Sequence, residues 1–261
     1  MQKDLFMILF KHLLILSLLY SSIHAIEIKS LHHAVDIAGK QRMYTQRMLK
    51  DYAMIGMKNN FDKPDEDLKS IINKFENHLI SLQNYTQNRA IIESTKKTQK
   101  LWIPIKKILE EQPQKEKSLK LQEQLDFLLQ ASDTTTHLFS KDTGKKSGII
   151  IDISGRQRML SQRVASLYML KVWGIKSKNF QNKMDKSMKL FEESLVQLKK
   201  FKFNTKEINN LLKEVEQSFT FFKIMNKKSK TFIPTLIYKK SNDILKNMDK
   251  VTTNYVNLKV K

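Results

Sequence analysis

Apolar residues recur every three or four positions along most of the chain, the spacing that gathers them on one face of an α-helix. In the first part of the chain this spacing joins Val35, Ala38, Leu49 and Tyr52. Further on it joins Ile71, Phe75, Leu79 and Leu82. The pattern therefore predicts amphipathic helices.

Helix-breaking residues divide this pattern at regular intervals. In the first half the breaks fall at Asn59–Asn60 with Pro64, at Gln83–Asn88, at Pro113 and at Gly144–Gly148. In the second half they fall at Ser177–Asn179, Phe203–Thr205 and Pro234. Pro104 lies inside the third segment and is expected to start or kink that helix. Each half therefore contains four helices of about 20–28 residues, each about 30–40 Å long.

The two halves are copies of one unit. The segment DIAGKQRMYTQRMLKDY at residues 36–52 returns as DISGRQRMLSQRVASLY at residues 152–168, an offset of 116 residues. At the same offset Phe75–Glu76 returns as Phe191–Glu192. The pair Leu129 and Asp133 returns near the end of the chain as Leu245 and Asp249. A repeat of this length predicts two similar domains.

Four helices joined by short loops form an antiparallel bundle. We therefore predict an all-α fold of two tandem antiparallel four-helix bundles, over residues 27–143 and 144–261. The alternative is a single long rod in which the last helix of the first unit continues into the first helix of the second. Gly144 and Gly148 weigh against the rod, because glycine is a poor helix former.

The N-terminal 25 residues differ from the rest. Lys3 and Lys11 are followed by the apolar run LLILSLLY at 13–20 and by a small residue, Ala25. This order is typical of a secretory signal peptide, and the apolar stretch is short for a membrane span of ~20 residues. We expect residues 1–25 to be a signal peptide and the protein to be periplasmic. An uncleaved N-terminal membrane anchor is the alternative.

Composition narrows the function classes. The chain has 47 Lys and Arg against 26 Asp and Glu, a formal net charge of +21, and no Cys. The lack of Cys excludes disulfides, thiolate catalysis and Cys-ligated metal sites. The lysines are scattered, with no dense patch or reading motif, so we expect no nucleic-acid partner.

The most informative residues are those that stay identical between the copies. The shared core is a glycine, an arginine three residues later and a glutamine four residues after that: Gly39, Arg42 and Gln46 in the first copy, Gly155, Arg158 and Gln162 in the second. Glycine inside a helix costs about 0.5–1 kcal/mol relative to alanine, so its repetition indicates a close approach of another helix or space for a ligand.

One helix cannot aim two of these arginines at one point, because Arg42 and Arg47 lie about 140° apart around its axis. Two converging guanidiniums therefore require Arg42 and Arg158 to meet from the two copies. Such a pair repels until an anion arrives and presents planar donor forks to it. We predict that Gly39, Arg42, Gln46, Gly155, Arg158 and Gln162 bind a small anionic ligand.

Structural roles compete with this interpretation. Arg42 and Arg158 could lie at the surface or pair with carboxylates, and Arg47 has Asp51 four residues on, at salt-bridge spacing. Met43, Met159, Tyr52 and Tyr168 are expected to be core residues. The histidines His78 and His137 are expected to lie on the surface.

The repeated motif resembles the "AG-x-QRM-x-SQR" helix in the N-terminal sensory domain of type IV pili methyl-accepting chemotaxis transducers. It is related more distantly to the sensing helix of nitrate/nitrite sensor kinases. The resemblance covers residues ~30–258 and implies a periplasmic four-helix bundle that senses a small ligand. In the nitrate sensors an anion is held between the first helices of two subunits by the arginine that matches Arg42 and Arg158 here.

Two departures qualify that implication. Receptors of this family continue through a second membrane helix into signalling modules, whereas this chain ends at Lys261. The nitrate sensors also lack the glutamine found here at Gln41 and Gln157, so nitrate is one candidate ligand among several.

We therefore expect an exported protein that senses or binds a small ligand, an oxyanion such as nitrate or nitrite, without an output domain of its own. It would act through a membrane receptor or signalling protein. Whether it also forms a homodimer is a question that the sequence leaves open. The alternative is an exported structural or adaptor protein whose Gly–Arg helix is a packing interface. No catalytic triad, phosphate loop or metal motif is present, so we expect no enzyme activity, no cofactor and no metal.

Overall fold

The structure is a computed structural model that describes residues 25–144, 146–228 and 233–258. Within these ranges it contains eight α-helices that make up 82% of the residues, and no strand. The all-α prediction is confirmed. No helix in the described ranges is long and apolar enough to cross a membrane. The predicted signal peptide, residues 1–25, lies outside the described residues apart from Ala25.

The first unit contains helices α2 (Leu31–Gly56), α3 (Pro64–Tyr85), α4 (Arg89–Glu110) and α5 (Ser118–Asp142). Ser30 caps α2 by accepting a hydrogen bond from the backbone N–H of His33, and Asn88 caps α4 in the same way. Pro64 is the first residue of α3, where its missing N–H removes no helical bond. Pro104 does not start α4, which runs through it.

The second unit contains α6 (Lys146–Val172), α7 (Phe180–Lys199), α8 (Lys206–Lys228) and α9 (Pro234–Asn257). The predicted breaks at Ser177–Asn179 and Phe203–Thr205 fall between two of these helices. Thr205 accepts a hydrogen bond from the backbone N–H of Ile208 at the start of α8, and Pro234 opens α9.

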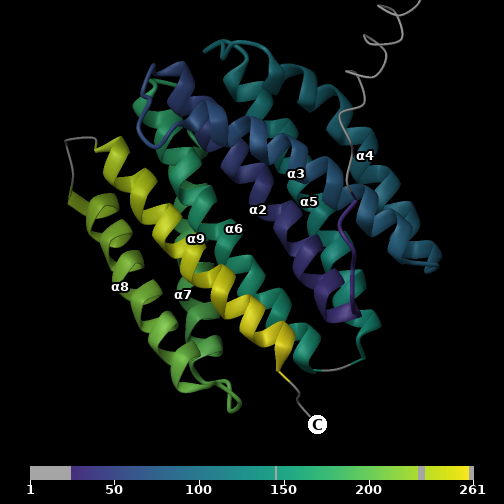
Figure 1. Cartoon of the computed structure of the whole chain (residues 1–261). Helices are drawn as coiled ribbons and strands as arrows, with labels where there is room; N and C mark the ends of the chain where they lie inside the picture. The colour runs from purple at the N-terminus through teal and green to yellow at the C-terminus, as the bar shows by residue number, and fades with distance from the viewer. Residues whose placement is uncertain (1–24, 145, 229–232, 259–261) are drawn as a thin grey trace, which may run out of the picture.

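Contacts between helices close each unit into a ring. In the first unit α2 packs against α3 and α5, and α4 packs against both of these. In the second, α6 packs against α7 and α9, and α8 against both. Figure 1 shows α2 and α6 side by side in the middle of the molecule, with α3–α5 on one side and α7–α9 on the other. We call the α2–α6 contact the seam.

The rod alternative does not form. α5 ends at Asp142, α6 begins at Lys146, and the two helices pack against each other. Gly144 between them has φ +62°, a left-handed conformation that side chains disfavour. The division into independent domains at residues 143 and 144 stays a prediction.

Apolar side chains from all eight helices form the core. Met43, Met159, Tyr52 and Tyr168 are buried in it, as predicted. Phe191 and Phe219 stack with their ring centroids 4.0 Å apart, and Phe75 packs on Trp102 in the corresponding place of the first unit. The exceptional part of the interior is the seam, where fully buried charged residues replace apolar ones.

Candidate ligand-binding seam

The two motif glycines face each other where α2 crosses α6. A Cβ atom on Gly155 would stand 3.9 Å from the Cα of Gly39, and one on Gly39 would stand 4.0 Å from the Cα of Gly155. The two helix backbones therefore approach closely at this point. Of the two reasons considered for a glycine inside the helix, a close helix–helix approach is the one that the structure contains.

The same crossing brings Arg42 and Arg158 together. The terminal Nη2 nitrogens of both side chains lie within 3.4 Å of the point where a Gly39 Cβ would stand. Both arginines are fully buried, with exposed fractions of 0%. The missing glycine side chains thus leave room for two guanidinium groups at the seam.

Four aspartates surround this pair of arginines. Nη1 of Arg42 lies 2.6 Å from Oδ1 of Asp133 on α5 and 2.7 Å from Oδ1 of Asp152 on α6. In the second copy, Nη1 of Arg158 lies 2.6 Å from Oδ1 of Asp249 on α9, and its Nη2 lies 2.7 Å from Oδ1 of Asp36 on α2. We call these six residues the arginine–aspartate cluster.

Each arginine therefore makes one ion pair within its own unit and one across the seam. Arg42 joins α2 to α5 through Asp133 and to α6 through Asp152. The Nη2 of Arg42 also donates to the backbone carbonyl of Asp152 at 3.1 Å. The cluster links the first and last helices of each bundle and ties the two bundles to each other.

The arginines keep the buried carboxylates ionised. Burial alone would raise the pKa of Asp36, but Arg158 and Lys40 outweigh burial and hold it below its usual value. The pKa of Asp152 is lowered in the same way: burial would raise it, but Arg42 and His137 outweigh burial. The pKa of Asp133 is also lowered, by His137 and Arg42 against burial. The cluster is a set of ion pairs at neutral pH.

The expectation of two arginines that repel until an anion arrives is corrected by these contacts. The carboxylates of Asp36, Asp133, Asp152 and Asp249 already neutralise the guanidiniums. Arginine pairing with carboxylates, the structural alternative considered for Arg42 and Arg158, is therefore present. The physical reason is that a bare pair of buried cations would be too unfavourable for the fold.

The sequence shows that these aspartates are repeated, but it does not show that they contact the arginines. Asp36 and Asp152 belong to the repeated motif, and Asp133 and Asp249 recur at the same offset. The signal that could have identified them is charge: each copy repeats two aspartates and a buried arginine in the same register. Helical periodicity alone does not tell which distant helix meets the motif.

One donor on each arginine remains without a partner. The Nε atoms of Arg42 and Arg158 are buried and make no hydrogen bond with the described residues. A buried N–H without an acceptor is unfavourable by about 1–3 kcal/mol, more for a charged group. The seam therefore retains hydrogen-bonding capacity that the protein does not use.

The motif glutamines have different roles. Nε2 of Gln41 donates to the backbone carbonyl of Phe75 and that of Gln157 to Phe191, each at 2.9 Å, so they fix α2 to α3 and α6 to α7. Nε2 of Gln46 donates to Oγ1 of Thr45, its neighbour, and Nε2 of Gln162 donates to the backbone carbonyl of Ser241. Both glutamines are buried on the same helices as the arginines, but their hydrogen bonds with the described residues go to other partners than the guanidiniums.

The arginines at the second motif position pair outside the seam. Arg47 forms a bidentate pair with Asp67 on α3, at 2.7 and 2.8 Å, so the expected pairing with Asp51 is wrong. Arg163 pairs with Asp126 on α5 at 2.7 Å. A tertiary partner with two matched oxygens replaced the local partner in the same helix.

Asp51 belongs instead to a buried polar group that the sequence did not reveal. It accepts a hydrogen bond from the hydroxyl of Tyr238 on α9 at 2.8 Å, and burial raises its pKa well above the ordinary value. Next to it, Nζ of Lys50 donates to Gln162, Ser241 and Asn242. These bonds join α2 of the first unit to α6 and α9 of the second.

Lys50 should make the stability of the protein depend on alkaline pH. Burial lowers its pKa to about 8, whereas the unfolded value is about 10.5. Between these pH values only the unfolded state keeps the proton, so this residue's contribution to the free energy of unfolding rises with pH. We expect a rise on the order of 2–3 kcal/mol relative to Lys50→Met. Urea unfolding of both proteins at pH 7.5 and 10 measures it, and parallel pH profiles would contradict it.

Two histidines also differ from expectation. His78 is buried against Tyr44, and burial lowers its pKa to about 4, so it is neutral. His137 on α5 is half-exposed, but it bonds both Asp133 and Asp152. Hydrogen bonds to these aspartates raise the pKa of His137 to about 9. The prediction of surface histidines was wrong for His78 and incomplete for His137.

Comparison with known proteins agrees with this architecture. The family model described as type IV pili methyl-accepting chemotaxis transducer N-term matches residues 27–134 and 142–219, one segment in each repeat. No curated protein and no solved structure matches the chain. The relation to nitrate/nitrite sensor kinases stays a prediction. On the strength of the two matched segments, the chain belongs to the type IV pili methyl-accepting chemotaxis transducer N-terminal family.

Proposed function

We propose that the protein is a periplasmic sensor of a small anion, which binds at the seam between Arg42 and Arg158. The observation that carries the proposal is the convergence of the two buried guanidiniums between the two copies. The family supports a sensory role in general. In this account the two repeats act as an internal pseudo-dimer, and the protein passes its signal to a membrane receptor or signalling protein.

The anion would exchange with the more exposed aspartates. The side chains of Asp133 and Asp249 are 37% and 48% exposed, whereas those of Asp36 and Asp152 are 6–7% exposed. A ligand arriving from solvent would therefore displace Asp133 or Asp249 and leave the bonds across the seam in place. It would gain donors from a guanidinium and from the unpartnered Nε.

This exchange supplies a signal as well as a binding site. Asp133 and Asp249 lie on α5 and α9, the last helix of each unit, and each is tied to the first helix through its arginine. Displacement of the carboxylate releases that tie. The ligand therefore favours a state in which α5 or α9 shifts relative to α2 or α6, which is the differential contact that a ligand-driven change requires.

Because the ligand replaces an existing ion pair, we expect modest affinity, with a Kd of roughly 10 µM to 1 mM. An anion at 100 times its Kd should stabilise the fold by about 2.7 kcal/mol. For a protein of this size that corresponds to a rise in Tm of about 5–10 °C. Thermal unfolding with nitrate, nitrite, acetate and phosphate, each against sodium chloride at equal ionic strength, measures it.

A second candidate function is favoured by the four aspartates. They neutralise the charge of the arginines without any ligand, as expected of an exported structural or adaptor protein whose Gly–Arg helices form a packing interface. The chloride control separates the two, because a chain of net charge +21 gains some stability from any added salt. Equal Tm values in all four anions and chloride would support the structural role and contradict anion sensing.

A further inference from the structure

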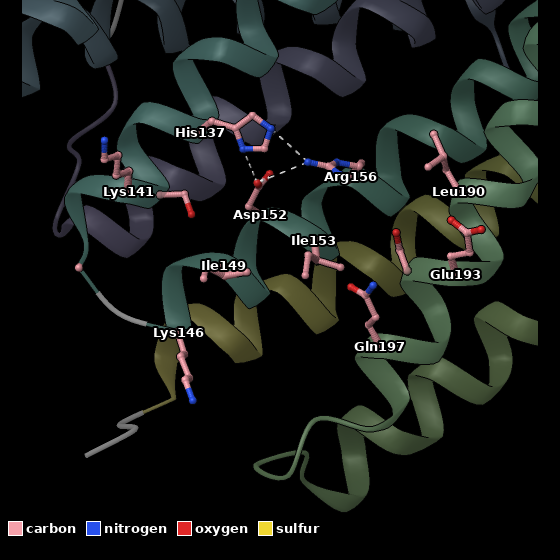
Figure 2. A pocket seen from close by; sticks show the side chains of 13 residues that line it. His137, Lys141, Lys146, Ile149, Asp152, Ile153, Arg156, Leu190, Glu193 and Gln197 are labelled. Carbon is pink, nitrogen blue, oxygen red and sulfur yellow. Dashed lines mark hydrogen bonds and ion pairs between the residues drawn. The ribbon is translucent and has the colours of Figure 1, made fainter.

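A groove opens on one side of the arginine–aspartate cluster, outside the seam. It lies between the α5–α6 corner and α7 and has a volume of about 730 Å³, within the usual size of small-ligand sites. Figure 2 shows His137, Asp152 and Arg156 meeting at one wall, with Leu190, Glu193 and Gln197 of α7 across from them.

The charged wall of this groove carries an unbalanced positive charge. Oδ2 of Asp152 accepts a hydrogen bond from Nδ1 of His137 at 2.8 Å. The same oxygen lies 3.6 Å from Nη2 of Arg156. Behind them, Arg42 and Asp133 complete the group. We call Arg42 with Asp133 and Asp152 the Arg42 half of the cluster. Within the described part of the chain, three cations (Arg42, His137 and Arg156) contact its two carboxylates.

The protonation of His137 matters for this balance. Its Nε2 lies 3.2 Å from Nη2 of Arg156 and 3.3 Å from Oδ2 of Asp133, so it can accept from the first or donate to the second. The two aspartates decide the matter, because they raise the pKa of His137 to about 9 and keep it protonated. The imidazolium and the guanidinium are then like charges in contact, a pair that a further anion would stabilise.

The other half of the cluster lacks this excess. At the 116-residue offset Arg156 corresponds to Lys40, and His137 corresponds to Thr253, which carries no charge. There, Arg158 and Lys40 face Asp36 and Asp249, two cations against two carboxylates among the described residues. The third cation is therefore specific to the Arg42 half of the cluster and does not follow from the repeated motif.

Apolar side chains complete the groove next to the charged wall. Ile149 and Ile153 of α6 and Leu190 of α7 line it, and Ile149 and Leu190 are 55% and 45% exposed. Figure 2 shows Ile149 and Ile153 side by side on α6, below His137 and Arg156. A ligand that fits both parts has an anionic head and a short apolar body.

We propose that this groove binds a small organic carboxylate, with the carboxylate on Arg156 and His137 and the hydrocarbon chain on Ile149, Ile153 and Leu190. The site is distinct from the seam, and it holds whether or not an anion enters between Arg42 and Arg158. It also touches the seam through Asp152, so its occupant would draw His137 and Arg156 away from that carboxylate. Carboxylate binding in the groove thereby adjusts the ion pairs of Arg42.

Butyrate is a suitable probe, because it has the charge and a three-carbon body. We expect it to shift the methyl NMR signals of Ile149 and Ile153 saturably, with a Kd near 1 mM or below. Ile37, which corresponds to Ile153 in the first repeat and is 2% exposed, is the internal control. Butylamine has a hydrocarbon body one carbon longer and a positive charge, and nitrate has the negative charge without the body. Both should shift the two signals at least tenfold more weakly.

Matched variants decide which residues bind the probe. Arg156→Gln should weaken butyrate binding at least tenfold, whereas Lys40→Gln, at the corresponding position of the other repeat, should leave it unchanged. Leu190→Asp places a negative charge on an exposed position of the groove, away from Asp152, and should also weaken binding. The seam is tested separately by Asp249→Asn, which frees Arg158 in the other half of the cluster, away from His137 and Arg156.

Equal shifts for butyrate and butylamine, or equal losses in Arg156→Gln and Lys40→Gln, would overturn the proposal. So would the absence of saturation at Ile149 and Ile153. If none of the tested anions bound at the seam of the unaltered chain while butyrate still shifted Ile149 and Ile153, the proposed function would be contradicted and the groove proposal would stand.

Discussion

Replacing Arg158 with methionine is expected to lower the free energy of unfolding by about 3–5 kcal/mol. Methionine fills similar space but removes the fully buried cation between Asp36 and Asp249, and leaves Asp36, whose side chain is only 6% exposed, with Lys40 as its remaining cation. A buried carboxylate that loses its closest cation must either stay charged at high cost or take up a proton. Urea unfolding followed by circular dichroism measures the loss.

Two controls identify the cause. Lys199→Met removes a surface pair with Glu216, whose side chains are 44% and 48% exposed, and should cost no more than about 1 kcal/mol. The double variant Arg158→Met, Asp36→Asn removes both buried charges and should recover part of the stability. A loss in Arg158→Met no larger than in Lys199→Met would show that the cluster contributes little to the fold.

Gly155→Leu is expected to destabilise the protein by about 3 kcal/mol or more, because the seam has no room for a side chain. The Cβ alone would stand 3.1 Å from Nη2 of Arg158 and 3.9 Å from the Cα of Gly39. The remaining leucine atoms would have to displace the guanidiniums from their aspartates. Thermal and urea unfolding of the variant measure the effect.

Alanine at the two glycines provides a graded comparison. At Gly39 the new Cβ would lie 3.4 Å from both Nη2 atoms, an ordinary contact, and alanine gains about 0.5–1 kcal/mol in helix propensity. At Gly155 the nearest atom is at 3.1 Å, so a guanidinium held by two aspartates must move. We expect Gly39→Ala to be nearly neutral and Gly155→Ala to be the less stable of the two. The reverse order would mean that the seam is packed differently.

The helices could be predicted because their signals are local. The spacing of Ile71, Phe75 and Leu79 and the breaks at Pro64 and Pro234 depend only on neighbouring residues. The repeat also showed that Arg42 and Arg158 occupy equivalent positions. It could not show that their helices would cross at the glycines, although the glycines gave a reason to expect a close approach.

The partners of the arginines were harder to predict, because they depend on which helices meet. Arg47 pairs with Asp67 on α3 and not with Asp51, which is nearer in the sequence. A bidentate pair across the bundle holds the guanidinium better than a partner in the same helix. Lys50 and Asp51 have no charged counterpart in the second copy, where Ser166 and Leu167 stand. Comparison of the two copies therefore does not identify Lys50 and Asp51.

The difference between the two halves is the feature that the repeat concealed. His137 and Thr253 occupy equivalent positions, as do Arg156 and Lys40, but among the described residues it is the Arg42 half of the cluster that combines a third cation with this groove. The copies share the buried arginine and its aspartates. They differ in the residues that surround those aspartates, so the two halves of the cluster can bind different ligands.

The most direct test of anion sensing at the seam is isothermal titration of nitrate, nitrite, acetate and phosphate into three proteins at constant ionic strength: the unaltered chain, Asp133→Asn and Asp126→Asn. Asp133 competes with the ligand for Arg42, whereas Asp126 pairs with Arg163 outside the seam. We predict that at least one anion binds the unaltered chain, that Asp133→Asn binds it about tenfold more tightly, a gain of about 1.4 kcal/mol, and that Asp126→Asn leaves its affinity unchanged. No binding by the unaltered chain, or equal affinities in all three proteins, would contradict the account.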